Sequence, residues 1–343
     1  MLLFFEMIHM QKGNFASMDQ PQESTQGHVG GSHTVASMDR KKPSPSSTIS
    51  LNSDAVDRLL AKDPQAVICT TKQRAFYLQR PHYFKGVSPW HKFTLYTNLS
   101  QVLSCGANVE PLVIDIGADA YWVKMFGTKR THCKSTQLLL VDPNPYRVQQ
   151  LRNSSSELRP HFLETHIEQV AIANYSGLAA FYFNQKPGLS GAGSLTEGKL
   201  AAKRFPDHPS TMTEVATLDS LVDRVKPNAT IPFLKVAARG WELEALHGAI
   251  RSLQRTHMVW FAHSHHWRSS LNAAVEFLQT LGFVTFLISH DGLVRLNAPY
   301  WDPIYDSISG EQQVLALQAS SPLLQKRRLG IFCVNPLPKT PGM

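Results

Sequence analysis

Several acidic, basic and histidine side chains in this sequence of 343 residues stand directly after short apolar runs. The first of these runs, 112–116, contains Asp115 and is followed by Gly117. A glycine turn directly after a buried strand lets a nucleotide-like ligand come close to the main chain. One acid and one glycine after a strand are common, so this turn alone indicates a nucleotide-binding fold only weakly.

A second acid, Asp142, ends the next apolar run, 137–141, and lies 27 residues after Asp115. An acid at the end of the second strand can accept hydrogen bonds from both hydroxyls of a ribose, although the usual spacing is about 20 residues. The alternative is that Asp142 caps the helix expected to begin near Pro145. The sequence leaves both interpretations open.

Three histidines, His263, His265 and His266, follow a later apolar run, 257–261. An imidazole at a strand end can act as a general base near pH 7. His263 and His265 also fall on one side of an extended segment, as metal ligands would, but no other motif supplies the missing ligands. A polar loop without chemistry is the third interpretation.

A basic residue, Arg239, follows the run 232–236. Its guanidinium could attract an anionic group of a substrate. It could equally be a solvated side chain in a site that has lost its activity. Trp241, two residues later, is expected to pack in the core.

Alternating strands and helices must position these residues. Strands are predicted over 112–116, 137–141, 167–172, 178–183, 232–236, 257–261, 283–288 and 330–334. Helices are predicted over 54–62, 94–105, 145–153, 241–253 and 268–281. Because the strands are apolar on both faces, we expect an α/β fold with a mainly parallel sheet and helices on both faces. Ligands of such folds bind beyond the carboxyl ends of the strands.

Composition divides the chain into four parts. Residues 1–50 are polar and lack periodicity, which predicts a disordered N-terminal segment. Residues 51–109 are interpreted as a helical lead-in or cap, 110–335 as the α/β domain, and 336–343 as a C-terminal tail. The charges of the first 50 residues cancel, so the net charge of +8 belongs to the rest of the chain.

Several classes of protein are excluded or disfavoured by the same composition. No run approaches the ~20 apolar residues of a membrane span, and no secretory signal is recognisable, so we expect a cytoplasmic protein without an integral membrane segment. The four cysteines form no CxxC pair, which excludes a zinc ribbon. No Lys/Arg run with interleaved aromatic residues supports a nucleic-acid partner.

Five segments in this order and spacing resemble the FkbM family of S-adenosylmethionine-dependent methyltransferases. They are Val113-Ile-Asp-Ile-Gly-Ala118, Val141-Asp-Pro-Asn-Pro145, Ala171-Ile-Ala-Asn-Tyr-Ser-Gly177, Val215-Ala-Thr-Leu-Asp-Ser-Leu221 and Phe233-Leu-Lys through Gly248-Ala249. The block Thr217-Leu-Asp-Ser-Leu221 with the last segment is the most specific part. The resemblance covers roughly residues 110–265.

The resemblance implies a Rossmann-like class I methyltransferase fold for residues 110–335. It also implies S-adenosylmethionine as the cofactor, flanked by Asp115, Gly117, Ala118 and Asp119, with Asp142 on its ribose. Members of the family are associated with O-methylation of hydroxyl groups on small molecules and sugars, which implies a small-molecule or glycan acceptor. The oligomeric state is left open.

Three departures from the family pattern concern the site itself. Asp119 and Tyr121 stand where the first loop usually has Asn and Gly, and Tyr brings a ring where glycine allows close approach. Ala237 and Arg239 replace the two acids of the pattern Lys-Ile-Asp-Val-Glu-Gly. The histidines that begin at His263 stand where the family tends to have an acid.

Two functions therefore compete. The first is an active O-methyltransferase with an altered site, in which His263 or His265 serves as the base and Arg239 contacts the substrate. The second is a catalytically inactive relative that serves as a binding or scaffold module. Methyl transfer depends mainly on positioning and tolerates change away from the cofactor pocket, so the first is preferred.

Overall fold

The computed structural model describes most of the chain after residue 109. The described residues are 110–118, 135–158, 162–183, 193–195, 210–264, 267–288, 293–298, 301, 303–308 and 311–321. The segments predicted as disordered N-terminus, lead-in and tail lie outside them. So do the helices predicted over 54–62 and 94–105 and the strand predicted over 330–334.

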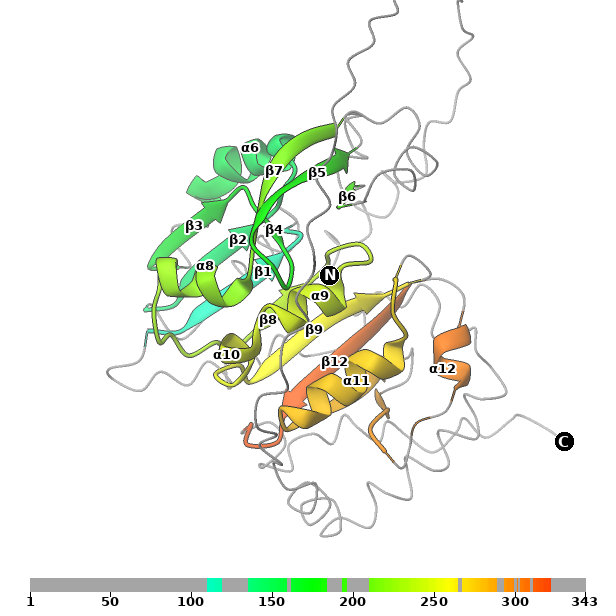
Figure 1. Cartoon of the computed structure of the whole chain (residues 1–343). Coiled ribbons are helices and arrows are strands. Elements are labelled where there is room, and N and C mark those ends of the chain that lie inside the picture. The colour runs from blue at the N-terminus through cyan, green and yellow to red at the C-terminus, as the bar shows by residue number, and fades with distance from the viewer. Residues whose placement is uncertain are drawn as a thin grey trace, which may run out of the picture. The chain divides into compact units, whose positions relative to one another are not determined.

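The described part is built around a sheet of eight strands (Figure 1). In chain order these strands are β1 (Leu112–Ile116), β2 (Gln137–Val141), β3 (Glu164–Glu168), β8 (Leu234–Val236), β9 (Met258–His263), β10 (Phe283–Ile288), β11 (Leu293–Arg295) and β12 (Gln312–Gln318). They lie side by side in the order β11-β10-β12-β9-β8-β1-β2-β3.

Strand direction in this sheet is mainly parallel. The neighbours from β3 to β9 are parallel, whereas β12 is antiparallel to both β9 and β10, and β11 is antiparallel to β10. Every residue of β1 and β2 is buried, as expected for strands covered on both faces. The order, with β12 inserted antiparallel between β9 and β10, confirms the predicted Rossmann-like class I methyltransferase fold.

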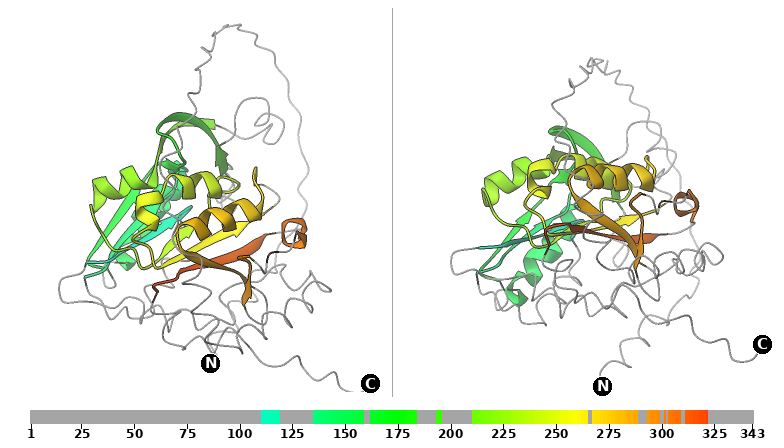
Figure 2. Two further views of the ribbon diagram at one scale, coloured as in Figure 1. Left: turned by 60° about the horizontal axis from the view of Figure 1, so that its bottom comes forward. Right: turned by 90° about the horizontal axis from the view of Figure 1, so that it is seen from below.

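Helices cover both faces of the large sheet, as predicted. They are α6 (Pro145–Ser154), the short 3₁₀ turn η3 (Ser155–Glu157), α8 (Leu218–Val225), α9 (Glu242–His247), α10 (Ile250–Leu253), α11 (Leu271–Thr280) and α12 (Ile304–Ser307). Figure 2 shows α8 to α11 on one face of the sheet and α6 on the opposite face. None of the described helices is long and apolar enough to cross a lipid bilayer.

A second, smaller sheet has the strand order β4-β7-β5-β6. Its strands are β4 (Ala171–Ile172), β5 (Gly177–Phe183), β6 (Gly193–Leu195) and β7 (Ser210–Ala216). Phe181 and Phe183 of β5 are buried in a cluster that also contains Trp241. The expected packing role of Trp241 is therefore confirmed.

Two sequence predictions need correction at the junction of the two sheets. The single strand predicted over 167–172 is two strands, because β3 pairs with β2 and ends at Glu168, whereas β4 pairs with β7. The single helix predicted over 241–253 is broken at Gly248. A Cβ on Gly248 would lie 2.0 Å from the carbonyl oxygen of Ala173, so the small sheet approaches the helix there too closely for any other residue.

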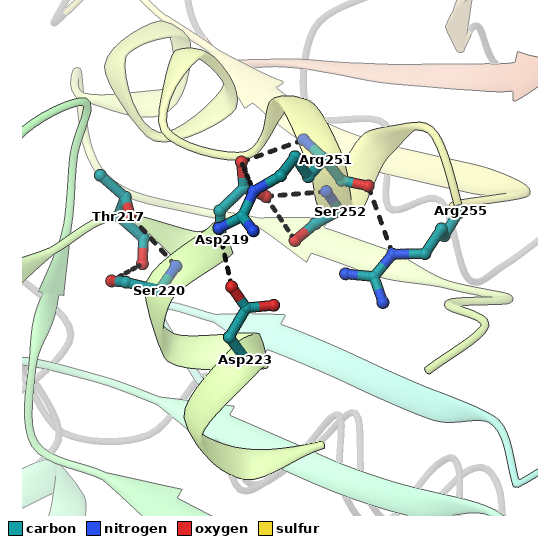
Figure 3. A network of polar contacts seen from close by, with 7 residues as sticks. All are labelled: Thr217, Asp219, Ser220, Asp223, Arg251, Ser252 and Arg255. Atoms are coloured by element: carbon teal, nitrogen blue, oxygen red, sulfur yellow. Dashed lines mark hydrogen bonds and ion pairs between the residues drawn. The ribbon is translucent and has the colours of Figure 1, made fainter. Parts of the chain in front are cut away.

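The segment Thr217-Leu-Asp-Ser-Leu221 joins two helices. Thr217 caps α8 by accepting the backbone N–H of Ser220 at 3.1 Å. The carboxylate of Asp219 accepts the backbone N–H groups of Ser252 at 2.7 Å and of Arg251 at 3.0 Å, in the first turn of α10 (Figure 3). These N–H groups have no partner within the helix, so Asp219 satisfies them and ties α8 to α10.

Candidate active site

The carboxyl end of β1 is held by a buried ion pair with β8. Asp115 and Lys235 are paired in register on these parallel strands, and Lys235 Nζ lies 2.5 Å from Asp115 Oδ1. The same ammonium donates to the carbonyl oxygen of Gly117 at 3.0 Å. The residues are 2% and 7% exposed, so removing one partner would leave the other charge buried. Asp115 therefore acts in the structure as an anchor for the turn, and Lys235 is a site residue that sequence reasoning missed.

Gly117 is required by a contact between two turns. Its φ is +68°, and a Cβ at this position would lie 2.1 Å from the carbonyl oxygen of Ala237, which follows β8. The N–H groups of Gly117 and Ala118 both point to the carbonyl oxygen of Val141, at 2.9 and 3.2 Å. The glycine thus brings the ends of β1, β2 and β8 together at one point.

Asp142 follows β2 at this same edge. Its Oδ1 accepts the backbone N–H of Asn144 at 2.8 Å, and Asn144 in turn caps α6 by accepting from Tyr146 N at 3.0 Å. The interpretation of Asp142 as the helix cap is therefore wrong, because Asn144 performs that role. Among the described residues, no side chain donates a hydrogen bond to the Asp142 carboxyl.

Burial decides the charge state of Asp142. The residue is partly exposed, but neighbouring atoms shield its carboxyl, and this desolvation raises its pKa to about 7. The Asn144 N–H, Arg147 and Lys235 counteract part of the shift, while the Asp115 charge adds to it. The structure thus brings Asp115, Gly117, Ala118 and Asp142 together, whereas Asp119 lies outside the described residues.

The turn after β8 has a backbone that favours glycine but carries an arginine. Arg239 is exposed with φ +48°, and Gly240 follows with φ +100°. The carboxyl of Glu242, only 2% exposed, accepts the Gly240 N–H at 2.7 Å. Burial raises the pKa of Glu242 to about 8, against the opposing effect of the backbone N–H groups of Gly240 and Arg239. Glu242 therefore shapes this turn. Sequence reasoning missed its role, although an acid two residues after Gly240 could have indicated it.

Trp241 joins this turn to the small sheet. Its indole N–H donates to the carbonyl oxygen of Leu195 in β6. The guanidinium carbon of Arg268 lies 4.9 Å from the centre of the Trp241 ring. This is a cation–π contact, and it places Arg268, which follows β9, over the segment that follows β8.

His263 ends β9 as a buried side chain. It is 6% exposed, and its ring meets that of Trp267 edge-on, with 4.8 Å between centroids. Burial lowers the pKa of His263 to about 4, although the Asp306 charge opposes the shift. The imidazole is therefore neutral at pH 7 and a weak base. His265 lies outside the described residues, and within those described no group of three His, Cys, Asp or Glu side chains is placed to hold a metal ion.

Comparisons with known proteins agree with this geometry. The methyltransferase FkbM domain matches residues 104–285, which is more than half of the chain. No curated protein matches the sequence.

Solved structures of methyltransferases are similar to this chain at low identity. A methyltransferase FkbM from Methylobacillus flagellatus is 14% identical with a TM-score of 0.38, and the match covers 77% of this chain and 58% of that one. The N-terminal domain of human METTL16 is 12% identical with a TM-score of 0.33, over 66% of this chain and 68% of that one. The chain thus spans little more than half the length of the first of these proteins.

Proposed function

Because the chain belongs to the FkbM methyltransferase family, we propose that it uses S-adenosylmethionine to methylate a hydroxyl group of a small molecule or sugar. The cofactor would bind at the carboxyl ends of β1 and β2. When bound there, it supplies an electrophilic methyl group on a sulfonium. The residues of the chain hold and orient the reactants, and methyl transfer depends mainly on this positioning.

The carboxyl of Asp142 is the observation that supports this proposal. It lies at the carboxyl end of β2, desolvated enough to raise its pKa to about 7, and accepts one backbone N–H. An acceptor in such surroundings gains from donors that a ligand brings, and the two hydroxyls of a ribose are such donors. The chain therefore fits the nucleoside part of the cofactor at this position.

The remaining residues of this edge fix the turns beside the proposed cofactor site. The Lys235–Asp115 pair fixes the end of β1 against β8. Gly117 lets the turn after β1 lie against the carbonyl of Ala237. The nearest atoms of residue 237 belong to its main chain, and the small side chain of alanine at that position leaves the contact intact.

A second candidate function is a binding module that has lost catalysis. It is favoured by the described residues at the ends of β8 and β9, where Ala237 and Arg239 stand in place of acids and His263 is a weak, buried base. Formation of S-adenosylhomocysteine in the presence of hydroxyl compounds separates this function from the first.

Calorimetry of the full chain with S-adenosylmethionine tests the proposal. We expect micromolar binding that becomes about tenfold weaker in Asp142→Asn, because the amide keeps the contact with Asn144 N but loses the charge. Asp223→Asn, a matched change at an exposed acid of α8, should leave the affinity unchanged. No measurable binding at high micromolar cofactor would overturn the proposal.

The pH dependence adds a second readout. Ribose hydroxyls bind the ionised carboxylate better, so affinity should rise with pH through the Asp142 pKa of about 7, by roughly tenfold from pH 6 to pH 8. The Asp142→Asn variant should show no such rise. A wild-type affinity that is constant over this range would show that Asp142 does not contact the ligand.

A further inference from the structure

The outward face of the small sheet carries apolar side chains at positions that are usually polar. Side chains along a strand alternate between two faces, and an antiparallel sheet with one solvated face usually places polar side chains there. In β5, Phe181 and Phe183 point inward and are buried in one cluster with Trp241. The alternate positions Leu178 and Ala180 therefore point outward, and Leu178 is 72% exposed.

The strand β7 adds a second large apolar side chain to the same face. Met212 lies directly opposite Ala180 in the antiparallel pair of β5 and β7 (Figure 1). It is 62% exposed, and Leu178 is its diagonal neighbour, at the distance of about 7–8 Å over which long side chains make contact. These two are the most exposed of the large hydrophobic side chains in the part of the chain that the structure describes. Because they are neighbours, they form a patch rather than isolated surface residues.

Charges of both signs border this patch. Glu214 is exposed and lies opposite Leu178 on the same face. The guanidinium of Arg224 in α8 lies 3.6 Å from the carboxylate of Glu214 and 3.7 Å from that of Glu168 in β3. One cation thus stands between two acids. This rim disfavours a polyanion such as a nucleic acid or an acidic membrane, and it suits a partner that carries charges of both signs.

We propose that this outward face, which contains Leu178, Met212 and Glu214, binds the same face of a second copy of the chain around a two-fold axis. A two-fold interface brings a surface against itself, so that each apolar patch meets an identical one. Arg224 of each copy then approaches the acids of the other copy, which gives complementary charges at the rim.

The size of the face determines the strength of this association. Two strands of seven residues present a face of about 24 by 10 Å, whereas a stable interface buries about 800 Å² on each partner. The dimer is therefore weak, and it dissociates on dilution.

Sedimentation equilibrium of the full chain over a range of micromolar concentrations tests the dimer. We expect reversible association that weakens about tenfold or more in Leu178→Lys/Met212→Lys, because like charges then meet across the axis. Both side chains are exposed, so the variant should fold as the wild type does, which circular dichroism checks. The matched control Leu163→Lys changes a leucine that is 57% exposed just before β3, and it should associate as the wild type does.

Two results of this experiment would overturn the proposal. The first is a wild-type chain that stays monomeric at every concentration, whether the face then binds a different protein or nothing. The second is equal association of the wild type and the double lysine variant, because the dimer would then form through another surface.

Charge reversal at the rim tests the two-fold arrangement. Arg224→Glu makes the rim entirely acidic, and Glu168→Arg/Glu214→Arg makes it entirely basic. Each variant alone should associate less than the wild type, whereas an equimolar mixture of the two should recover association as a heterodimer. Variants that had merely lost their fold would not recover in the mixture. A mixture that associates no better than either variant alone would show that the rims do not face each other, and the proposed arrangement would fail.

Discussion

The carboxyl edge of the large sheet has two halves that differ in what their side chains do. In the β1–β2 half, Asp115 is paired with Lys235, Gly117 packs against a carbonyl, and Asp142 keeps acceptor capacity. In the β8–β9 half, Arg239 and Arg268 are exposed, while Glu242 and His263 are buried.

The difference shows how one half of a site can change while the other stays the same. The two halves touch through the Asp115–Lys235 side-chain pair and through the Gly117 turn, which packs closest to the carbonyl oxygen of Ala237. Neither contact uses the side chain of residue 239, so that side chain can vary without disturbing the cofactor half. The following predictions test this separation, from the largest expected effect to the smallest.

Lys235→Met should lower the free energy of unfolding by about 4 kcal/mol, because it leaves the Asp115 carboxylate buried without its ion pair. Urea denaturation followed by circular dichroism measures the loss. The double variant Asp115→Asn/Lys235→Met should recover part of it, since no buried charge remains. A loss below about 1 kcal/mol would show that the pair does not hold the two halves together.

Gly117→Ala should cost about 3 kcal/mol, because its Cβ would collide with the Ala237 carbonyl and its φ of +68° disfavours L residues. Gly177→Ala is the control for the collision, since φ is also positive there, at +156°, but nothing lies within 4 Å of the Cβ position. Chemical denaturation of both variants gives the comparison. Equal losses at the two glycines would contradict the main-chain contact between the halves.

Glu242→Ala should cost about 2 kcal/mol, because the buried N–H of Gly240 loses its acceptor, whereas Glu242→Gln should cost less. The pH dependence of the free energy of unfolding distinguishes the effect of the Glu242 charge from the effect of its shape. The folded-state pKa of about 8 lies above the ordinary glutamate pKa of 4.5, so the folded protein keeps a proton that the unfolded chain releases. Stability should therefore fall between pH 4.5 and 8, by up to about 1.4 kcal/mol per pH unit.

The Gln variant provides the reference for this pH effect. It lacks the titrating group and should lose less stability over the same range in denaturation at several pH values. Identical pH profiles for the wild type and Glu242→Gln would mean that the carboxyl is not desolvated beneath the turn.

Arg239→Gly should change the free energy of unfolding by less than about 1 kcal/mol. Glycine relieves the positive φ but makes the unfolded chain more flexible, and the two effects nearly cancel. Urea denaturation of the variant and the wild type measures the difference. A large loss of stability would show that the guanidinium supports the fold.

Local sequence patterns predicted the central strands well. The ranges predicted for β1, β2 and β10 match the structure, because each is a mostly apolar run with a sharp boundary. The strands β7 (Ser210–Ala216) and β12 (Gln312–Gln318) were missed, since polar residues interrupt or flank their apolar positions. Their places depend on partners that are distant in the chain.

The sequence by itself determined which chemical groups stand at the strand ends: Asp115, Gly117 and Asp142 in one half, Arg239 and His263 in the other. Only the tertiary structure decided which of these groups are paired with other residues or buried inside the protein. Lys235 reaches Asp115 across 120 positions of sequence because β8 lies beside β1. Packing likewise buries His263 under Trp267 and sets Arg268 over Trp241. Hydrophobic patterning specifies each strand locally, but the order of strands, a long-range property, determines which side chains meet.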